Sequence, residues 1–183
     1  MKETTRQRLL EIARCSVTAA VNGAPLPKVE ESDPELTGKQ GCFVTLKNGE
    51  HLRGCLGNFV SRIPLCRLVN EMARASATED PRFFSSPITP QELPQLAIEI
   101  SVLSTLERIA NPLDLELGVH GIYIRRGGAA GCFLPQVATE TGWSKEEFLR
   151  SCCSHKAGLA PDAWKQPDTE VYVFTADIIN EKE

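Results

Sequence analysis

The sequence lacks the features that mark exported and membrane proteins. No apolar run is long enough to cross a bilayer. The first eight residues are polar and lead into an amphipathic pattern, so they do not form a secretory signal peptide. We therefore expect a cytoplasmic protein that makes no membrane contact.

Frameworks of metal ligands and disulfides are also missing. The seven cysteines are scattered, no two of them have Cys-x-x-Cys spacing, and the three histidines form no His-x-x-x-His pair. Without an export signal, this use of cysteine is typical of reduced thiols. No zinc site is indicated. The chain carries no cofactor-binding motif either, so we predict neither a metal nor a cofactor.

The chain also lacks an excess of basic residues. The chain has 24 acidic and 20 basic side chains, a formal net charge of −4. That balance argues against broad electrostatic binding of nucleic acid. The 183 residues are enough for a substantial core, and they show no internal repeat or low-complexity linker. We predict a single domain over residues 1–183.

The most informative stretch that is present runs from Leu52 to Phe59. It places Arg53, Cys55 and two glycines, Gly54 and Gly57, in one short extended segment. Glycine weakens a strand interior, and its usual justification is a bulge or a close approach by another group. This stretch is therefore the candidate working site.

A hairpin is predicted around Asn48-Gly49, because this dipeptide follows a run rich in β-formers and precedes the Leu52–Phe59 stretch. A two-residue turn would place Val44 opposite Arg53. A three-residue turn over 47–49 places Val44 opposite Leu52, and we favour it because it buries a continuous apolar set.

In the favoured register the two strands have one apolar and one mixed face. The apolar face holds Cys42, Val44, Leu46, Leu52 and Leu56. The mixed face holds Phe43, Thr45, His51, Arg53 and Cys55. On this interpretation Arg53 and Cys55 point the same way, away from the main core.

The remaining pattern predicts an α+β fold, in two α/β layers, with a largely antiparallel sheet and flanking helices. Helical spacing or helix-start signals occur over 5–22, from Pro64 to about Asp80, and from Ser144 towards Gly158. Strands are expected at 96–103, 120–125, 131–134 and 170–176. Thr89 to Glu92 resembles a capping box, as does Ser144 to Glu147.

Cys55 is a candidate nucleophile, because a cation such as Arg53 favours the reactive thiolate. His51 or His120 is a candidate base, which Glu99 would orient. The alternative is a structural cysteine, since free cysteine is among the most buried residue types.

The charged candidates also have structural alternatives. Arg53 suits a carboxylate or phosphate, but it can equally form an internal ion pair with Glu99 or Asp80. Asp80 can simply cap the turn that follows it, and His120 can make a structural hydrogen bond.

Several blocks of the chain resemble the AMMECR-one domain family. They are Leu52-Arg53-Gly54-Cys55-Leu56-Gly57, Asp80-Pro81-Arg82-Phe83, Ile98-Glu99-Ile100-Ser101-Val102-Leu103, His120-Gly121-Ile122, Leu134-Pro135-Gln136-Val137 and Lys156-Ala157-Gly158-Leu159. The resemblance covers nearly the whole chain. One departure is the link through 152–155, which is slightly longer than is usual in the family.

The resemblance implies two unequal subdomains, with the Leu52–Gly57 motif facing a cleft between them. The family has no established biochemical activity. Its prokaryotic members are often encoded beside, or fused to, MEMO-like and radical SAM proteins, which implies a shared pathway.

Two hypotheses follow. In the first, an enzyme-like cleft acts on a small anionic or nucleotide-like ligand. Its candidate catalytic residues are Cys55, Glu99 and His120, and its candidate ligand-binding residues are Arg53, Gly54, Gly57 and Asp80. In the second, the motif belongs to a non-catalytic ligand-binding or adaptor module for the MEMO-like and radical SAM partners.

Overall fold

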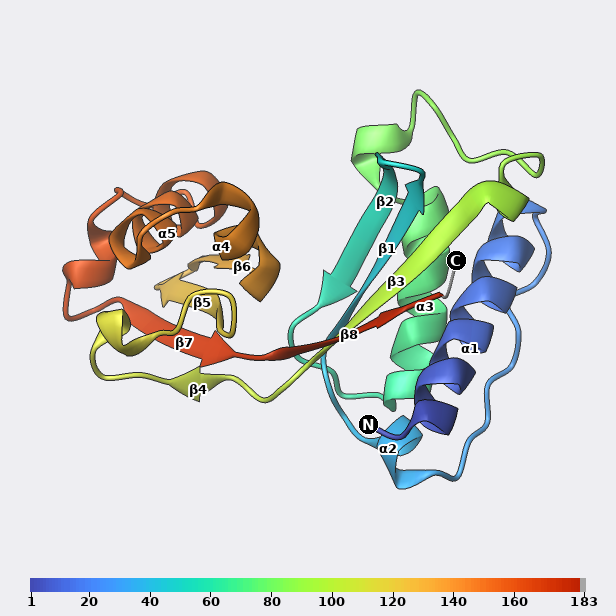
Figure 1. Ribbon diagram of the computed structural model, residues 1–183, viewed down its shortest axis with the longest axis horizontal. Helices are drawn as coiled ribbons and strands as arrows, with labels where there is room; N and C mark the ends of the chain where they lie inside the picture. Colours follow the sequence, from blue (N-terminus) through green and yellow to red (C-terminus); the bar gives the residue numbers. More distant parts are fainter. Residues whose placement is uncertain (182–183) are drawn as a thin grey trace. The chain divides into compact units, whose positions relative to one another are not determined.

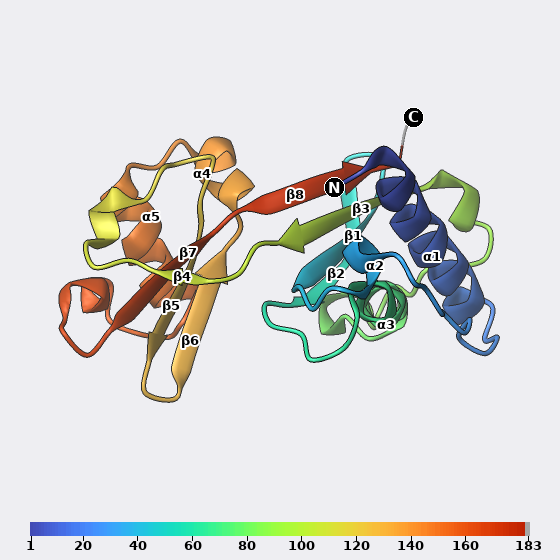
Figure 2. The same ribbon diagram turned by 90° about the horizontal axis from the view of Figure 1, so that it is seen from below.

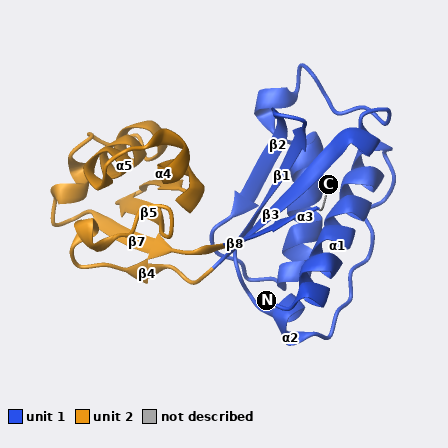
Figure 3. Cartoon of the chain, viewed as in Figure 1, with its two compact units in different colours: residues 1–103, 177–183 blue, residues 104–176 orange. Residues whose placement is uncertain are grey.

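The computed structural model describes residues 1–181 as two compact units (Figure 3). Unit 1 contains residues 1–103 and the C-terminal segment from Asp177, and unit 2 contains residues 104–176. The two four-stranded sheets are antiparallel and open, which confirms the predicted α+β class. None of the described helices is long and apolar enough to cross a membrane.

Unit 1 is a sheet in the order β2-β1-β3-β8, covered by helices (Figure 1). Its helices are α1 (Glu3–Val21), α2 (Pro34–Thr37) and α3 (Leu65–Thr78), with short 3₁₀ turns η1 (Pro81–Phe83) and η2 (Leu93–Gln95). Its strands are β1 (Cys42–Asn48), β2 (His51–Asn58), β3 (Leu96–Leu103) and β8 (Ala176–Asn180). The short helix α2 begins at Pro34, and the Asp33 side chain caps it by accepting from the Glu35 N–H.

The core of unit 1 lies between this sheet and the helices α1 and α3, which pack against one another and against the sheet (Figures 1 and 2). The alternation of β1 and β3 sends every second side chain into the core. Cys42, Val44, Leu46 and Ile100 are fully buried there. The helices supply the predicted apolar stripes, including Leu9, Val17, Leu65 and Val69. We name this covered side of the sheet the helix face.

The predicted hairpin is present, but both predicted registers are wrong. The turn is Gly49-Glu50, with Gly49 at a φ of 55°, and Asn48 pairs with His51. The pairing then shifts, so that Lys47 lies opposite Leu52 and Leu46 lies opposite Gly54. Arg53 is the extra residue, a β-bulge that the turn signal does not encode.

The bulge changes which side chains share a face. Val44 lies opposite Leu56 rather than Leu52, and Leu52 is partly exposed. The predicted grouping of Cys42, Val44, Leu46 and Leu56 is confirmed, as is that of Phe43, Thr45 and Cys55. Leu52 and Arg53 do not follow the predicted alternation. We name the side of the sheet with Phe43, Thr45 and Cys55 the polar face.

Unit 2 has a sheet in the order β4-β7-β5-β6. Its strands are β4 (Glu107–Arg108), β5 (Gly121–Arg126), β6 (Ala129–Phe133) and β7 (Glu170–Phe174). Its helices are α4 (Pro135–Thr141) and α5 (Lys145–Ser151), with 3₁₀ turns η3 (Pro112–Asp114) and η5 (Ala163–Lys165) and a π-helix η4 (Cys152–Lys156). A core around Ile122, Phe148 and Val171 joins the sheet to these helices.

Two helix signals in the sequence have different outcomes. At Ser144 the capping box is confirmed, with reciprocal hydrogen bonds between Ser144 and Glu147. Over Thr89–Glu92 the chain forms a turn that leads into η2, which has no side-chain cap. The Glu92 carboxylate binds Arg53, and a weaker hydrogen bond from the Thr89 main chain also lowers its pKa. The predicted strand 170–176 is divided between β7 and β8, which belong to different sheets.

Candidate functional site

The polar face of unit 1 carries a row of side chains across three strands. Thr45 of β1 pairs with Cys55 of β2 on one side and with Glu99 of β3 on the other. The Thr45 hydroxyl donates to the Cys55 sulfur at 3.3 Å. Cys55 is partly exposed, whereas Thr45 is buried. The Cys55 sulfur is therefore held by a neighbouring strand and still has access to solvent.

Cys55 is also held through its main chain by a pair of residues at the edge of the sheet. Its N–H donates to Asp80 Oδ2 at 2.9 Å, and its carbonyl accepts from Arg82 Nη2 at 3.1 Å. The same guanidinium binds Asp80, with Arg82 Nε 2.9 Å from Oδ1 and Nη2 2.6 Å from Oδ2. Because β2 is an edge strand, its outward backbone groups would otherwise need water or another strand. We call Asp80 and Arg82 the edge clamp.

Both side chains of the edge clamp are held in their charged forms. Asp80 is 3% exposed, and its hydrogen bonds with Arg82 hold the pKa of its carboxyl at about 2. The pKa of Arg82 is raised, first by its hydrogen bonds with Asp80 and to a smaller extent by Cys55. Arg82 Nη2 lies 3.1 Å from the Cys55 carbonyl oxygen. It is the cation beside Cys55.

Arg53, the cation predicted for that role, is engaged elsewhere. At the bulge, its Nε lies 2.5 Å from Glu92 Oε1 and its Nη2 donates to the Ser86 carbonyl at 3.0 Å. Neither of the predicted ion-pair partners, Glu99 and Asp80, binds it. The Arg53 and Arg82 guanidinium carbons lie 5.8 and 5.5 Å from the centre of the Phe83 ring. Phe83 thus connects the bulge to the edge clamp.

Gly54 allows α3 to approach the strand closely. A Cβ at this position would lie 1.9 Å from the Ser76 carbonyl oxygen. The Ser76 hydroxyl donates to the Val44 carbonyl at 2.8 Å and accepts from the Leu56 N–H at 2.9 Å, so it bridges β1 and β2. The predicted close approach is confirmed, and the approaching group belongs to the protein itself.

Gly57 serves the polar face in a similar way. A Cβ there would lie 2.4 Å from Cγ of Phe43 and 2.3 Å from the Cys42 carbonyl oxygen. The Phe43 ring packs in turn edge-on against Phe59, with centroids 4.9 Å apart. Both motif glycines therefore position neighbouring parts of unit 1. Ligand binding by their backbones stays a prediction.

The two other candidate catalytic residues, Glu99 and His120, belong to other elements than Cys55. Glu99 is two strands away in the row, a separation of about 10 Å between backbones, and its carboxylate lies 3.4 Å from Lys47 Nζ. His120 belongs to unit 2, where its Nδ1 accepts from the Glu116 N–H at 3.0 Å. His51 is exposed beside the hairpin turn. No histidine is in the Cys55 row.

Sequence reasoning missed Arg82 and Thr45 as site residues. Arg82 follows an acid by two residues at a turn that proline begins, which is a weak signal for a clamped Asp-Arg pair. Asp80 is 25 residues from Cys55 in sequence, and only the course of α3 brings them together. Thr45 was placed correctly on the Cys55 face, but its contact with the sulfur follows from a register that the turn did not reveal.

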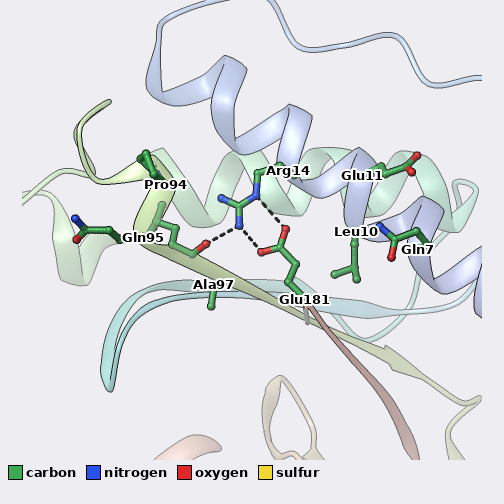
Figure 4. A pocket seen from close by; sticks show the side chains of 9 residues that line it. Gln7, Leu10, Glu11, Arg14, Pro94, Gln95, Ala97 and Glu181 are labelled. Carbon is green, nitrogen blue, oxygen red and sulfur yellow. Dashed lines mark hydrogen bonds and ion pairs between the residues drawn. The ribbon is translucent and has the colours of Figure 1, made fainter. Parts of the chain in front are cut away.

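Two cavities of unit 1 lie near these elements. One of about 300 Å³ adjoins the edge clamp; its lining includes Asp80, Phe83 and Ser76 but not Cys55. The other, of about 550 Å³, lies between α1 and the start of β3 (Figure 4). There Arg14 binds Glu181 and the carbonyls of Leu93 and Leu96, so its donors are already used. The Arg14 side chain in this second cavity therefore has a structural role, because it joins α1 to the start of β3 and to Glu181.

The thiols of unit 2 do not form a metal site. Cys152 and Cys153 are fully buried in the π-helix, and burial raises the pKa of both thiols. The π-helix, Cys152–Lys156, spans the link noted in the sequence. Among residues 1–181, no three His, Cys, Asp or Glu side chains converge as metal ligands.

The fold and the clamped motif define an α+β protein with a cysteine on an edge strand, and comparison with known proteins identifies its family. The AMMECR1 family profile matches residues 10–179. The chain belongs to the AMMECR1 family. A protein of Thermococcus gammatolerans is 39% identical over all of this chain and 93% of its own length. Protein MK0488 of Methanopyrus kandleri is 44% identical over 85% of this chain and 79% of its own length.

A solved structure agrees with this assignment. The crystal structure of the uncharacterized protein PH0010 from Pyrococcus horikoshii superimposes with a TM-score of 0.88 and 36% identity. The match covers 100% of this chain and 94% of that protein. None of these three relatives has a name that states an activity.

Proposed function

We propose that the polar face at Cys55 is an enzyme-like site for a small anionic or nucleotide-like ligand, with Cys55 as nucleophile and Arg82 as the anion-binding cation. The observation that carries the proposal is the way Cys55 is held. The edge clamp binds the Cys55 N–H and carbonyl, and the sulfur of this partly exposed residue accepts a hydrogen bond from the Thr45 hydroxyl. A hydrogen-bond donor and a cation beside a sulfur favour the thiolate form.

Arg82 can serve a ligand as well as the fold. Its side chain is 55% exposed although it binds the buried Asp80. An incoming carboxylate or phosphate would meet a guanidinium that is already oriented by its partner. Glu99 and Lys47 lie further along the same face and would contact the remainder of a ligand that extends across the row. His120 stays a candidate residue of unit 2.

The test is competitive alkylation with a matched pair of reagents, iodoacetamide and the anionic iodoacetate, resolved by peptide mass spectrometry. Cys15 is exposed and provides the reference thiol. We expect native Cys55 to react faster than Cys15 with iodoacetate, and by a larger factor than with iodoacetamide. We expect Arg82→Gln to remove this preference for the anionic reagent while leaving the reaction with iodoacetamide less affected. Cys55 that stays inert until the protein unfolds would refute a nucleophilic role.

A second candidate function is a non-catalytic ligand-binding or adaptor module. It is favoured by the internal pairing of the charged residues, since Arg53, Asp80 and Glu99 each have a partner within unit 1. The proteins that such a module would bind are the MEMO-like and radical SAM proteins that the family resemblance implies. In a reconstituted mixture, an adaptor would retain association and pathway activity with Cys55→Ala, whereas the enzyme-like site would lose activity.

A further inference from the structure

Unit 2 contains a cavity of about 530 Å³ that the Cys55 site does not use. Its volume is in the range of cavities that hold small organic molecules. It lies between the segment that follows β4 and the segment from η5 to β7, and its lining includes Arg108, Ile109, Pro112, Trp164, Lys165 and Thr169. All of its lining residues belong to unit 2.

Local hydrogen bonds fix the backbone around this cavity. The Ile109 N–H donates to the Val171 carbonyl at 3.1 Å, which ties one wall to β7. The Thr169 N–H donates to the Gln166 carbonyl at 3.1 Å and closes the opposite turn. The cavity is therefore largely preformed, as small-molecule sites usually are.

Two residues of this lining carry a buried polar atom without a hydrogen-bond partner. Four buried side-chain polar atoms of the described residues have no hydrogen-bond partner, and two of them are Trp164 Nε1 and Thr169 Oγ1. Trp164 is 6% exposed and Thr169 is 8% exposed. A buried polar group without a partner lowers the stability of the fold. A ligand that accepts from the indole N–H and the hydroxyl would remove this cost.

The charge around the cavity is positive. Its lining contains Arg108 and Lys165 and no acid. Each of these cations has only a longer contact with a carboxylate: Arg108 is 3.7 Å from Glu170, and Lys165 is 3.3 Å from Asp162.

Both of those carboxylates are held more closely by another arginine. Glu170 Oε2 is 2.8 Å from Arg125 Nε, and Asp162 Oδ1 is 2.6 Å from Arg150 Nη1. Four cations thus share two carboxylates, and two positive charges remain in excess in a chain whose net charge is −4.

We infer that this cavity binds a small organic anion with an apolar body. Arg108 and Lys165 would pair with its carboxylate or phosphate, while Ile109 and Pro112 would contact its carbon skeleton. Trp164 and Thr169 would donate hydrogen bonds to its acceptor atoms. The site is separate from the Cys55 row and needs none of its residues.

A matched pair of probes tests the charge requirement in the full-length protein. We expect 2-naphthoate to bind in isothermal titration calorimetry, and its neutral amide, 2-naphthamide, to bind at least about tenfold more weakly. Rising NaCl concentration should weaken the binding of naphthoate. The double substitution R108Q/K165Q should reduce affinity for naphthoate at least about tenfold and leave the amide unchanged.

A single-charge control at a position outside the cavity distinguishes a site from general attraction. Arg126 lies in the same unit, pairs with Asp168 and is not part of the lining. Arg126→Gln should leave naphthoate affinity within about twofold of the native value. An equal loss in R126Q and in R108Q/K165Q would refute the assigned cavity, as would equal affinity for acid and amide or no binding at millimolar concentrations.

Indole N–H signals in ¹H–¹⁵N NMR spectra locate the probe. The chain has two tryptophans, and Trp143→Phe assigns their two signals. Naphthoate should shift the Trp164 signal and leave that of Trp143 in place; the reverse pattern would place the ligand elsewhere and refute the inference. Binding should persist in Cys55→Ser, so the outcome is independent of the function proposed for unit 1.

Discussion

The two faces of the four-stranded sheet in unit 1 share their strands and differ in burial and polarity. On the helix face, Val44, Leu46 and Ile100 are fully buried. On the polar face, the alternate positions carry Thr45, Cys55 and Glu99. The comparison shows that the Leu52–Gly57 motif divides residue by residue, because Gly54 serves the closed face while Cys55 is presented on the open one.

The largest expected effect is on the helix face, at Gly54. Gly54→Ala would place a methyl group against the Ser76 carbonyl, with no flexible side chain to move aside. We expect a loss of about 3 kcal/mol or more in the free energy of unfolding, measured by urea titration. Gly128→Ala is the matched control, because its added Cβ meets no heavy atom within 4 Å. Equal stability of the two variants would contradict the close packing of α3.

The next effect is on the edge clamp between the faces. Asp80→Asn removes the charge that binds Arg82 and weakens the acceptor for the Cys55 N–H. We expect a loss of about 2 kcal/mol in unfolding free energy at neutral pH. Asp168→Asn, in an exposed pair with Arg126, should cost about 0.5 kcal/mol or less.

The pH dependence of stability sharpens this test. The pKa of Asp80 is about 2, below its ordinary value of 3.8. Its contribution is therefore fully present above about pH 4 and is lost as the pH falls towards about 2, because the unfolded chain binds the proton more readily. The native protein should lose more stability over this interval than Asp80→Asn does. Parallel curves would show that Asp80 titrates normally.

Ser76 tests the bridge between the strands on the helix face. Ser76→Ala leaves the Val44 carbonyl and the Leu56 N–H without their shared hydroxyl. We expect a loss of about 1–2 kcal/mol and faster hydrogen exchange at the Leu56 amide. Thr78→Ala, at an exposed position of the same helix, should leave that amide unchanged.

The smallest effect on stability is expected on the polar face. Thr45→Val preserves the shape of the side chain and removes the donor to the Cys55 sulfur. We expect a change in unfolding free energy of about 1 kcal/mol or less, but a clear fall in the rate of Cys55 alkylation relative to Cys15. Unchanged alkylation would show that the hydroxyl does not influence the thiol, and would contradict a chemical role for the polar face.

Much of the architecture was predictable because alternation and helical spacing are local signals. They located α1, α3 and β3, and they separated Val44 from Thr45 across the sheet. The register was not predictable, because the bulge at Arg53 has no strong local signature. For the same reason, local pattern could not show that residues 170–180 form two strands of different sheets.

The site was predictable only in part. Cys55 was identified from its flanking glycines, and the structure gives those glycines separate packing reasons. The cation beside Cys55 was misassigned to Arg53, because sequence proximity is a poor guide to which side chains meet across an edge. The course of the chain through α3 and η1 brings Arg82 next to Cys55, whereas Arg53 forms an ion pair with Glu92.

The C-terminal strand imposes an order on biogenesis. Unit 2 is an insertion in unit 1, because the chain leaves unit 1 after Leu103 and returns at Asp177. On the ribosome, the whole of unit 2 emerges before β8 can join β3, and before Glu181 can reach Arg14 and the Ile98 N–H. Domains generally fold as they emerge. A nascent chain that stops short of β8 would therefore expose the unpaired edge of β3, so unit 1 is completed only by a strand that is translated after unit 2.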